Sequence, residues 1–223
     1  TLGRQERWQE AISRYQNAVE VAADNPAKSN ALLHWGIALE KLDRWDGAVE
    51  RLEEALSLVP DDKLGLFYLG GCLEKAARAK DDSTYFNRAV ATFRKLIEIS
   101  PNDSFALNYL GYMYAERGIR LAEAVELLTR AVSLDPENGA FLDSLGWAHF
   151  RLGQFDEAER YLEKALALMD DADTEEQAVI HDHAGDVAAA LGKSDEAVKH
   201  WSRALDLFPG DRAVQRKLEG RAP

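Results

Sequence analysis

The sequence contains a single cysteine, Cys72, among its 223 residues. One cysteine cannot form a disulfide within the chain, and it excludes a metal site built from several thiolates. Cys72 stands among apolar residues in LGGCLEKA, which predicts a small buried thiol rather than a nucleophile. Cysteine usage therefore leaves the redox compartment open.

Long apolar stretches are also missing. No run approaches the roughly 18 apolar residues that a membrane-spanning helix needs, although 46% of the residues are apolar. The chain begins with Thr1, and no basic-then-apolar leader follows. We expect either that a targeting segment has been removed or that the chain is a fragment, so its location stays unknown and the cytoplasm is not excluded.

Basic residues are few compared with acidic ones. The sequence has 27 Lys and Arg against 39 Asp and Glu, a net charge of −12. Nucleic acids and anionic membranes are bound by clustered Lys and Arg, so neither is an expected partner. Seven carboxylates and no Lys or Arg lie between Asp170 and Asp186, whereas the tail from Arg212 to Arg221 is mildly basic. Such a run is usually a solvated face, but charge of one sign at one end of a chain can also select partners.

What the chain does contain is a repeat. The motifs HWG, YLG, YLG, SLG and HAG place glycines at spacings of 34, 41, 35 and 39 residues. About twelve residues after each glycine, or nineteen after Gly70, comes an alanine, then a large residue four further on and usually a small one three beyond it. The glycines are Gly36, Gly70, Gly111, Gly146 and Gly185; the later sets are Ala48, Leu52, Ala55; Ala89, Phe93, Leu96; Ala124, Leu128, Ala131; Ala158, Leu162, Ala165; and Ala197, Trp201, Ala204.

Both halves of each copy carry apolar residues at three- and four-residue spacing, which predicts a pair of amphipathic helices. Proline ends most of the second helices, as in SLVPDD and SLDPEN. The recurring glycine and alanine are expected to let the two helices approach closely, so that a bulky side chain at Gly111 or Ala158 would force them apart.

These residues resemble the tetratricopeptide repeat, whose pattern is leucine–glycine followed by an aromatic, and later alanine, an aromatic, alanine and proline. Five copies agree in both halves and cover nearly the whole chain. The last copy departs from the pattern, with His181 at the leading position and Ala188 in place of the aromatic. The resemblance implies an all-α fold, a right-handed α-solenoid of helix-turn-helix repeats that stack and share a core.

The expected boundaries follow the copies. They are a truncated half-repeat at 1–25, repeats at 29–62, 63–103, 104–138, 139–177 and 178–211, and a capping segment at 212–223 with a short helix after Asp211. Repeat 63–103 has seven extra residues, two helical turns, so each of its helices should be about one turn longer, with the turn at Asp81 to Ser83. Thr174 with Gln177 predicts a capping box before the last repeat.

No catalytic centre, metal site or cofactor is expected. In HDHAGD, His181 and His183 are two residues apart and point to different helix faces; only Asp182 and Asp186 converge, which is too few ligands for a metal. Ser144 and His149 occupy repeat positions without the strand–turn elbow of a serine hydrolase. Neither a phosphate loop nor a calcium loop occurs. The chain is therefore predicted not to be an enzyme.

The resemblance also implies a binding face, because first helices line the concave side of such solenoids. Exposed inner positions are expected three residues before and one residue after each repeat glycine, four apart on one helix face. The pairs are Leu33 and Ile37; Phe67 and Gly71; Asn108 and Tyr112; Asp143 and Trp147; Asp182 and Asp186. This face grades from apolar through aromatic to acidic. Chaperone-binding relatives clamp a terminal carboxylate with lysine and asparagine there, and only Asn108 matches in type, so acidic C-termini are not expected ligands.

The expected partner is a protein or peptide segment with apolar residues at one end and Lys or Arg at the other. Tyr112 and Trp147 are the predicted anchors, because aromatic residues dominate interface energetics. The alternative for each aromatic is packing against the adjacent repeat.

The leading interpretation is a non-catalytic adaptor with a preformed concave surface. Two alternatives stay open: self-assembly into homo-oligomers through the half-repeat, whose missing first helix would expose Trp8, Ala11, Tyr15 and Ala18, and a repeat arm of a larger protein with its catalytic domain elsewhere. Residues 105–207 are similar to the C-terminal part of long bacterial repeat proteins that are exported or lipid-anchored. That similarity implies a periplasmic or cell-envelope scaffold.

Overall fold

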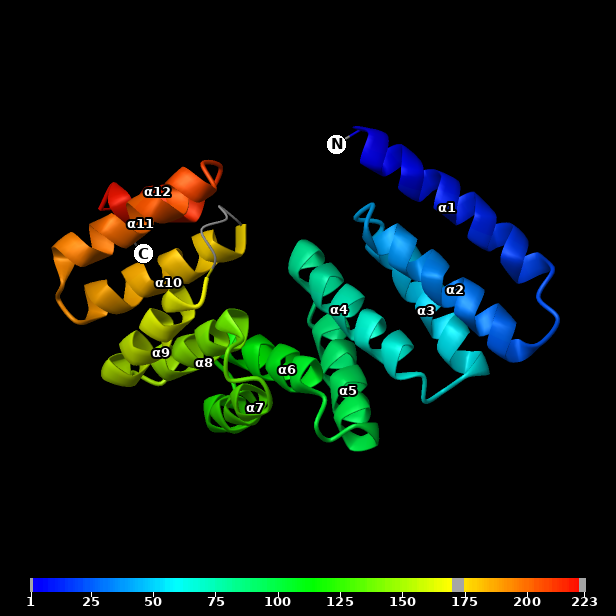
Figure 1. The fold of residues 1–223 in the computed structure, drawn as a ribbon, viewed down its shortest axis with the longest axis horizontal. Helices are drawn as coiled ribbons and strands as arrows, with labels where there is room; N and C mark the ends of the chain where they lie inside the picture. Colours follow the sequence, from blue (N-terminus) through cyan, green and yellow to red (C-terminus); the bar gives the residue numbers. More distant parts are fainter. Residues whose placement is uncertain (1, 170–174, 221–223) are drawn as a thin grey trace. The chain divides into compact units, whose positions relative to one another are not determined.

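The computed structural model describes residues 2–169 and 175–220, and every regular element in that part of the chain is a helix (Figure 1). The predicted all-α fold is therefore confirmed. The chain forms two compact units, residues 1–106 and 107–223, whose boundary falls inside one helix.

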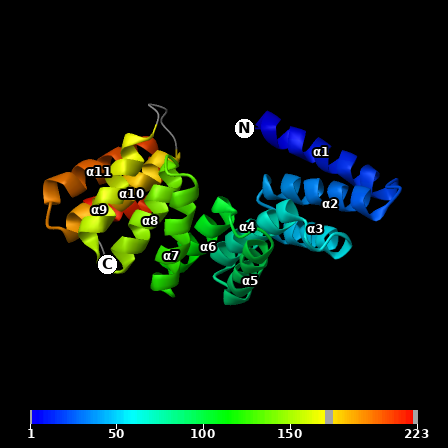
Figure 2. The same ribbon diagram turned by 60° about the horizontal axis from the view of Figure 1, so that its bottom comes forward.

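The first unit contains α1 (Leu2–Glu20), α2 (Asn25–Glu40), α3 (Trp45–Leu58), α4 (Lys63–Lys80), α5 (Ser83–Ile99) and the first turn of α6 (Ser104–Arg117). The second contains the rest of α6, α7 (Leu121–Leu134), α8 (Gly139–Arg151), α9 (Phe155–Ala167), α10 (Glu175–Ala190), α11 (Ser194–Leu207) and α12 (Arg212–Leu218). Consecutive helices pack as hairpins, α2 on α3, α4 on α5, α8 on α9 and α10 on α11 (Figures 1 and 2). We call the first helix of each hairpin the inner helix and the second the outer helix.

Aspartate or asparagine begins most inner helices. Such a side chain accepts a hydrogen bond from an otherwise unpaired backbone N–H of the first turn and so stabilises the helix start. The capping residues are Asp24, Asp62, Asp103, Asn138 and Asp211. The capping box predicted before α10 includes Thr174, which lies outside the described residues.

The two halves of the repeat pattern pack on each other. A methyl group at the repeat glycine would lie within 3.0 Å of the large side chain of the outer helix in every hairpin. At Gly111 the distance to Leu128 Cγ would be 2.6 Å, and Leu128 is fully buried. The pairs are Gly36 with Leu52, Gly70 with Phe93, Gly111 with Leu128, Gly146 with Leu162 and Gly185 with Trp201. The prediction that these residues are small to allow close approach is confirmed.

The longer repeat has two longer helices. Helices α4 and α5 have 18 and 17 residues, against 14 and 14 in α6 and α7. The turn between them is short, since Asp81 adopts a left-handed conformation after α4 and Asp82 caps α5. Both parts of the prediction, the added turn in each helix and the turn at Asp81 to Ser83, are confirmed.

The sequence predicted that α1 would expose its apolar side, but in the structure part of this side is covered. The helix packs against α2, where Ile12 is buried and the Tyr15 ring stacks on His34 with ring centres 5.7 Å apart. The four residues expected to be exposed, Trp8, Ala11, Tyr15 and Ala18, are half-buried. Helix α2 thus covers part of this side of α1, and a role of these four residues in self-association stays a prediction.

Candidate functional site

An apolar hollow of about 440 Å³ lies in the first unit beside the first turns of α4 and α6. Leu64, Phe67 and Phe105 line it, with Lys63 and Asp103 beside them. The side chains of Leu64 and Phe105 are 47% and 53% exposed, which is unusual for large apolar residues. The Phe67 ring contacts both sides of the α4–α5–α6 packing: it lies edge-on to the rings of Phe105 and Phe93, with ring centres 6.4 and 6.2 Å away.

The sequence predicted Phe67 as a surface residue but missed Leu64 and Phe105. Both stand six residues before a repeat glycine, in the first helical turn, and Leu64 is three residues before Phe67 on the same face. Val179 occupies the equivalent position in the last repeat and is 45% exposed. A large apolar residue two positions after the capping aspartate, as in Asp62–Leu64 and Asp103–Phe105, was the sequence signal for this exposed position.

The predicted inner-face residues divide into two groups. Leu33 and Asp143 are buried, each 5% exposed, so the prediction that they are exposed contacts is wrong. Leu33 is part of the hydrophobic core, and Asp143 is covered by His183 of the next inner helix. The others are half-buried: Ile37, Phe67, Gly71, Asn108, Tyr112, Trp147, Asp182 and Asp186.

Trp147 packs within the second unit. Its ring stacks on His183 at 4.1 Å and on Phe150 at 4.9 Å, and its Nε1–H donates to Glu116 Oε1 at 2.8 Å. Arg151 from the same helix donates to the Glu116 carbonyl oxygen at 2.7 Å. These contacts connect α6, α8 and α10, so the alternative of packing against an adjacent repeat is confirmed for Trp147.

A buried acid–histidine pair joins α8 to α10. His183 Nδ1 lies 2.8 Å from Asp143 Oδ1, and both residues are 5% exposed. Burial alone would lower the pKa of His183, but the Asp143 carboxylate, with Asp182 and Glu116, raises it overall. The Asp143 carboxylate accepts from the Nδ1–H of His183 and stabilises the protonated form of the ring relative to a histidine buried without an acid.

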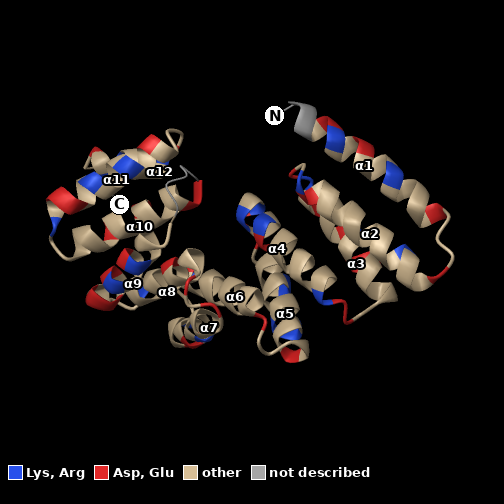
Figure 3. Ribbon diagram, viewed as in Figure 1, with Lys and Arg blue, Asp and Glu red and all other residues tan. Residues whose placement is uncertain are grey.

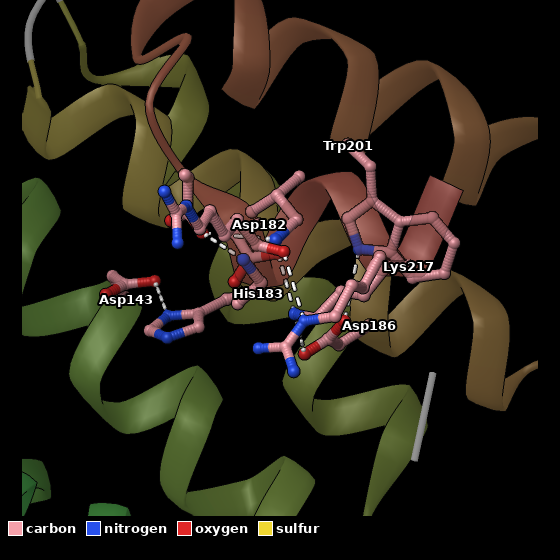
Figure 4. A network of polar contacts seen from close by, with 11 residues as sticks. Asp143, Asp182, His183, Asp186, Trp201 and Lys217 are labelled. Atoms are coloured by element: carbon pink, nitrogen blue, oxygen red, sulfur yellow. Dashed lines mark hydrogen bonds and ion pairs between the residues drawn. The ribbon is translucent and has the colours of Figure 1, made fainter. Parts of the chain in front are cut away.

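A second polar cluster joins α10 to α12 (Figure 4). Lys217 Nζ donates to Asp182 Oδ1 and Asp186 Oδ2, each at 2.7 Å, and Trp201 Nε1–H donates to Asp186 Oδ1 at 3.1 Å. Burial alone would lower the pKa of Lys217, yet its hydrogen bonds to the two aspartates raise it. Burial also raises the pKa of Asp182, an effect that Lys217 only partly opposes.

These clusters have a common form, a polar contact between successive inner helices. The partners are 31 to 40 residues apart, close to one repeat. The first unit has the same arrangement between α2 and α4, where Lys75 pairs with the buried Glu40. Burial alone would raise the pKa of Glu40, but Lys75 and Lys41 lower it overall. The acidic end of the inner face is thus neutralised in part by the chain itself.

Charged residues are unevenly distributed among the helices. Acidic and basic residues are interspersed along outer helices such as α9 and α11, whereas α6 carries only Glu116 and Arg117 (Figure 3). Cross-repeat ion pairs also occur beside the outer helices, for example at 2.6 Å between Lys193, which directly precedes α11, and Glu159 of α9. Mixed charges of this kind are typical of a solvated surface.

A half-buried histidine pair lies between α10 and α11. The Nδ1 atoms of His181 and His200 are 3.0 Å apart. Burial lowers the pKa of His181 to about 4, and repulsion from His200 and Arg203 adds to that effect. Burial, with the charge of Lys199, also lowers the pKa of His200. Both histidines therefore favour the neutral form at neutral pH.

Replacing His181 with leucine, the residue at this repeat position in the other copies, is expected to stabilise the second unit more at pH 5 than at pH 7.5. The folded pKa of His181 is depressed, so wild-type stability is lost as the pH falls from about 6.5 towards 4. The gain at pH 5 should be on the order of 1 kcal/mol after allowance for solvent screening. Urea denaturation of both proteins at the two pH values measures it, and an equal effect at both values would contradict the assignment.

The residues considered for chemistry do not assemble. Ser144 donates to the Ala140 carbonyl oxygen at 2.9 Å, while His149 contacts Gln154 at 2.7 Å and stacks on Tyr161. Cys72 is 1% exposed, and burial raises the pKa of its thiol to about 12. Within residues 2–169 and 175–220, no group of three or more His, Cys, Asp or Glu side chains could hold a metal ion. Nor does any helix in these ranges have the length and apolar character to cross a bilayer.

Known sequences identify the architecture. Models of the tetratricopeptide repeat match residues 1–61, 33–104, 92–126 and 120–180, which together reach from the first residue to the start of the last repeat. The chain belongs to the tetratricopeptide repeat family. The TPR repeat-containing protein PA4667 of Pseudomonas aeruginosa is 37% identical over 129 residues, 58% of this chain and 21% of that protein. The chain spans less than half the length of the relatives it matches.

Solved structures agree with this assignment. A tetratricopeptide repeat protein of Thermus thermophilus, TTC0263, superimposes with a TM-score of 0.67 at 25% identity, over 86% of this chain and 98% of that one. PilW, a type IV pilus biogenesis factor, gives a TM-score of 0.75 at 21% identity, over 96% of this chain and 92% of PilW. The predicted α-solenoid fold class is therefore confirmed. Folds of this family are typical of protein–protein interaction scaffolds.

Proposed function

We propose that this tetratricopeptide repeat chain is a non-catalytic interaction scaffold, and that the apolar hollow of the first unit receives apolar side chains of a partner protein segment. The observation that carries the proposal is the exposure of Leu64 and Phe105 on either side of Phe67. Covering apolar surface contributes roughly 25 cal/mol for each Å² removed from water, so two such side chains offer a sizeable gain to a partner.

The hollow is preorganised, which reduces the ordering cost of binding. Asp103 accepts from the Ala106 backbone N–H at 3.0 Å and holds the start of α6. Asp62 does the same for α4 through the Leu64 backbone N–H at 3.2 Å. Because the helix starts and the Phe67 ring are held in place, a partner meets a surface that is already formed.

The remaining half-buried inner-face residues stay candidates for the same partner. Ile37 lies in the first unit, and Asn108 and Tyr112 lie on α6 in the second. We propose that they extend the contact within their own units. Asp143 and Trp147 are omitted from this set, since each already has partners within the second unit.

We also propose a bacterial cell-envelope setting for the scaffold. Two bacterial likenesses support it, the Pseudomonas relative and PilW, whose name describes pilus biogenesis. The relatives are longer than this chain, which supports the view that it serves as the repeat arm of a larger protein. Self-assembly is the alternative, and the cavity of about 700 Å³ bounded by α1, α2 and α3 favours it as a place for a second copy to dock.

Selection of peptides from a random library on the full chain tests the apolar hollow. We expect the selected peptides to carry at least two large apolar side chains and to bind a Leu64→Asp, Phe105→Ser double variant about ten-fold or more weakly, because the variant removes the apolar surface they cover. Fluorescence anisotropy of labelled peptides measures the affinities.

Val21→Asp is the matched control, since Val21 is 81% exposed and lies outside the hollow. Its affinity for the peptides should equal that of the unsubstituted chain. Peptides that bind the double variant as tightly as they bind the unsubstituted chain would contradict the proposal. Light scattering that shows concentration-dependent multimers, retained in the double variant, would favour self-assembly through the α1–α3 cavity instead.

A further inference from the structure

Helix α12 is weakly attached compared with the other inner helices. It has seven residues, against 13 to 18 in the inner helices of the five repeats. Val214 is its one buried residue, at 1% exposure, and α12 packs chiefly on α11. Its polar anchor is Lys217, which reaches Asp182 and Asp186 on α10. A short helix with one fully buried side chain and one charged side chain bonded to α10 is a candidate for local release.

The receiving site is built without α12. Asp182 and Asp186 are four residues apart and share one face of α10. Trp201 of α11 holds Asp186 through its indole N–H, and the nearest histidine, His183, is already bonded to Asp143 (Figure 4). Asp186 is therefore held from α11 as well as from α12, and Lys217 is the group that both aspartates bind.

The register of Lys217 shows what this site accepts. Lys217 lies 35 residues after Asp182 and 31 after Asp186, so α12 takes the place of an inner helix of a further repeat. An apolar residue three positions before the lysine, here Val214, lies on the same helix face and is the part buried. A helical segment with this pattern, an apolar residue followed three positions later by lysine, reproduces every contact described here for α12.

We propose that Asp182 and Asp186 form a docking site for a lysine carried by a helical segment of a partner protein, and that α12 is the chain's own occupant of that site. Charge complementarity supports this occupant, because both carboxylates accept a hydrogen bond from one ammonium group, and release of Lys217 would leave two half-buried acidic side chains without that partner. The partner segment exchanges with α12. The proposal concerns the second unit and is independent of the apolar hollow.

The test uses the synthetic peptide GDRAVQRKLEG, residues 210–220, and two full-length variants of the chain. Lys217→Glu places a third carboxylate against the aspartate pair and should release α12, whereas Arg216→Glu makes the same charge change at the exposed neighbouring residue. We expect the peptide to bind the Lys217→Glu chain at least about ten-fold more tightly than the Arg216→Glu chain, because the intramolecular competitor is lost. A peptide with Lys217→Glu, or a chain that also carries Asp182→Asn and Asp186→Asn, should not bind.

Hydrogen exchange of the 212–218 amides gives a second readout that requires no substitution. Excess wild-type peptide should accelerate exchange in α12 of the wild-type chain. Slow amide exchange of α12 in the Lys217→Glu chain would overturn the proposal. So would fast exchange of α12 in that chain without binding of the 210–220 peptide. If Lys217→Glu fails to fold, Lys217→Met removes the charge and keeps the apolar stem. Dimerisation of the wild-type chain that the peptide abolishes would identify a second copy as the occupant and would also overturn the assignment to a partner protein.

Discussion

Alanine at Gly70 is expected to destabilise the first unit, whereas alanine at the adjacent Gly71 is expected to stabilise it. A methyl group at Gly70 would lie 2.7 Å from two atoms of the Phe93 ring, and Phe93 is fully buried. A methyl group at Gly71 would meet nothing within 4 Å. Both glycines lie inside α4, so both variants gain the same helix propensity of about 0.5–1 kcal/mol.

The difference between the two variants therefore isolates the packing cost. Overpacking a close-packed core costs about 1–3 kcal/mol, since the Phe93 ring or the helix backbone must shift. The midpoint of urea denaturation should fall for Gly70→Ala and rise for Gly71→Ala. Equal midpoints would mean that α4 and α5 can separate freely, and the account of the repeat given above would be wrong.

Alanine at Asp143 is expected to destabilise the second unit by about 3 kcal/mol or more, because it leaves the buried His183 without its partner. Replacing the pair together, as Asp143→Leu with His183→Phe, should cost much less, since no buried polar group is then left unpaired. Urea denaturation of the single and double variants measures the coupling between the two residues.

The same pair gives a pH dependence with a definite sign. The folded pKa of His183 is raised, so its contribution to stability is fully present below the unfolded pKa of about 6.5 and is lost as the pH rises through the folded pKa. The advantage of the wild-type chain over the double variant should therefore shrink as the pH rises above about 6.5. The histidines at 181 and 200 are present in both proteins, so their opposite dependence cancels.

The pair formed by Lys193 and Glu159 provides the control. It also links successive repeats, through outer helices, but both side chains reach solvent. Glu159→Ala should leave the denaturation midpoint unchanged, because exposed ion pairs contribute little. A loss as large as that of Asp143→Ala would show that repeat connectivity, rather than burial, determines the cost.

The local pattern of the sequence was enough to predict the helix pairs. The pair formed by Gly111 and Leu128 has an equivalent in every copy, because the two residues contact each other within one hairpin. A contact within one repeat recurs in the sequence with the repeat. The extra turn of α4 and α5 was predictable for the same reason, since insertion length and helical pitch are both local quantities.

The pairing of Asp143 was not predictable in this way. Periodicity placed Asp143 on the same inner face as Asp182 and predicted that both would be exposed. In the structure Asp143 is covered by His183, the neighbour of Asp182, and Asp182 instead meets Lys217. The spacings of these contacts differ from the repeat length by a few residues, and a repeat pattern does not show which side chain of the next helix points back.

The sequence by itself thus determined the all-helical repeat, its close-packed glycines and the family, because these depend on contacts within one hairpin. Only the tertiary structure showed that α2 covers α1, that Leu64 and Phe105 border one hollow, and that α12 supplies a lysine to the acidic pair. Each of these depends on side chains brought together from different repeats. The free energy of these contacts comes from burial and charge pairing between helices of different repeats, and the pattern of a single repeat does not show which side chains meet there.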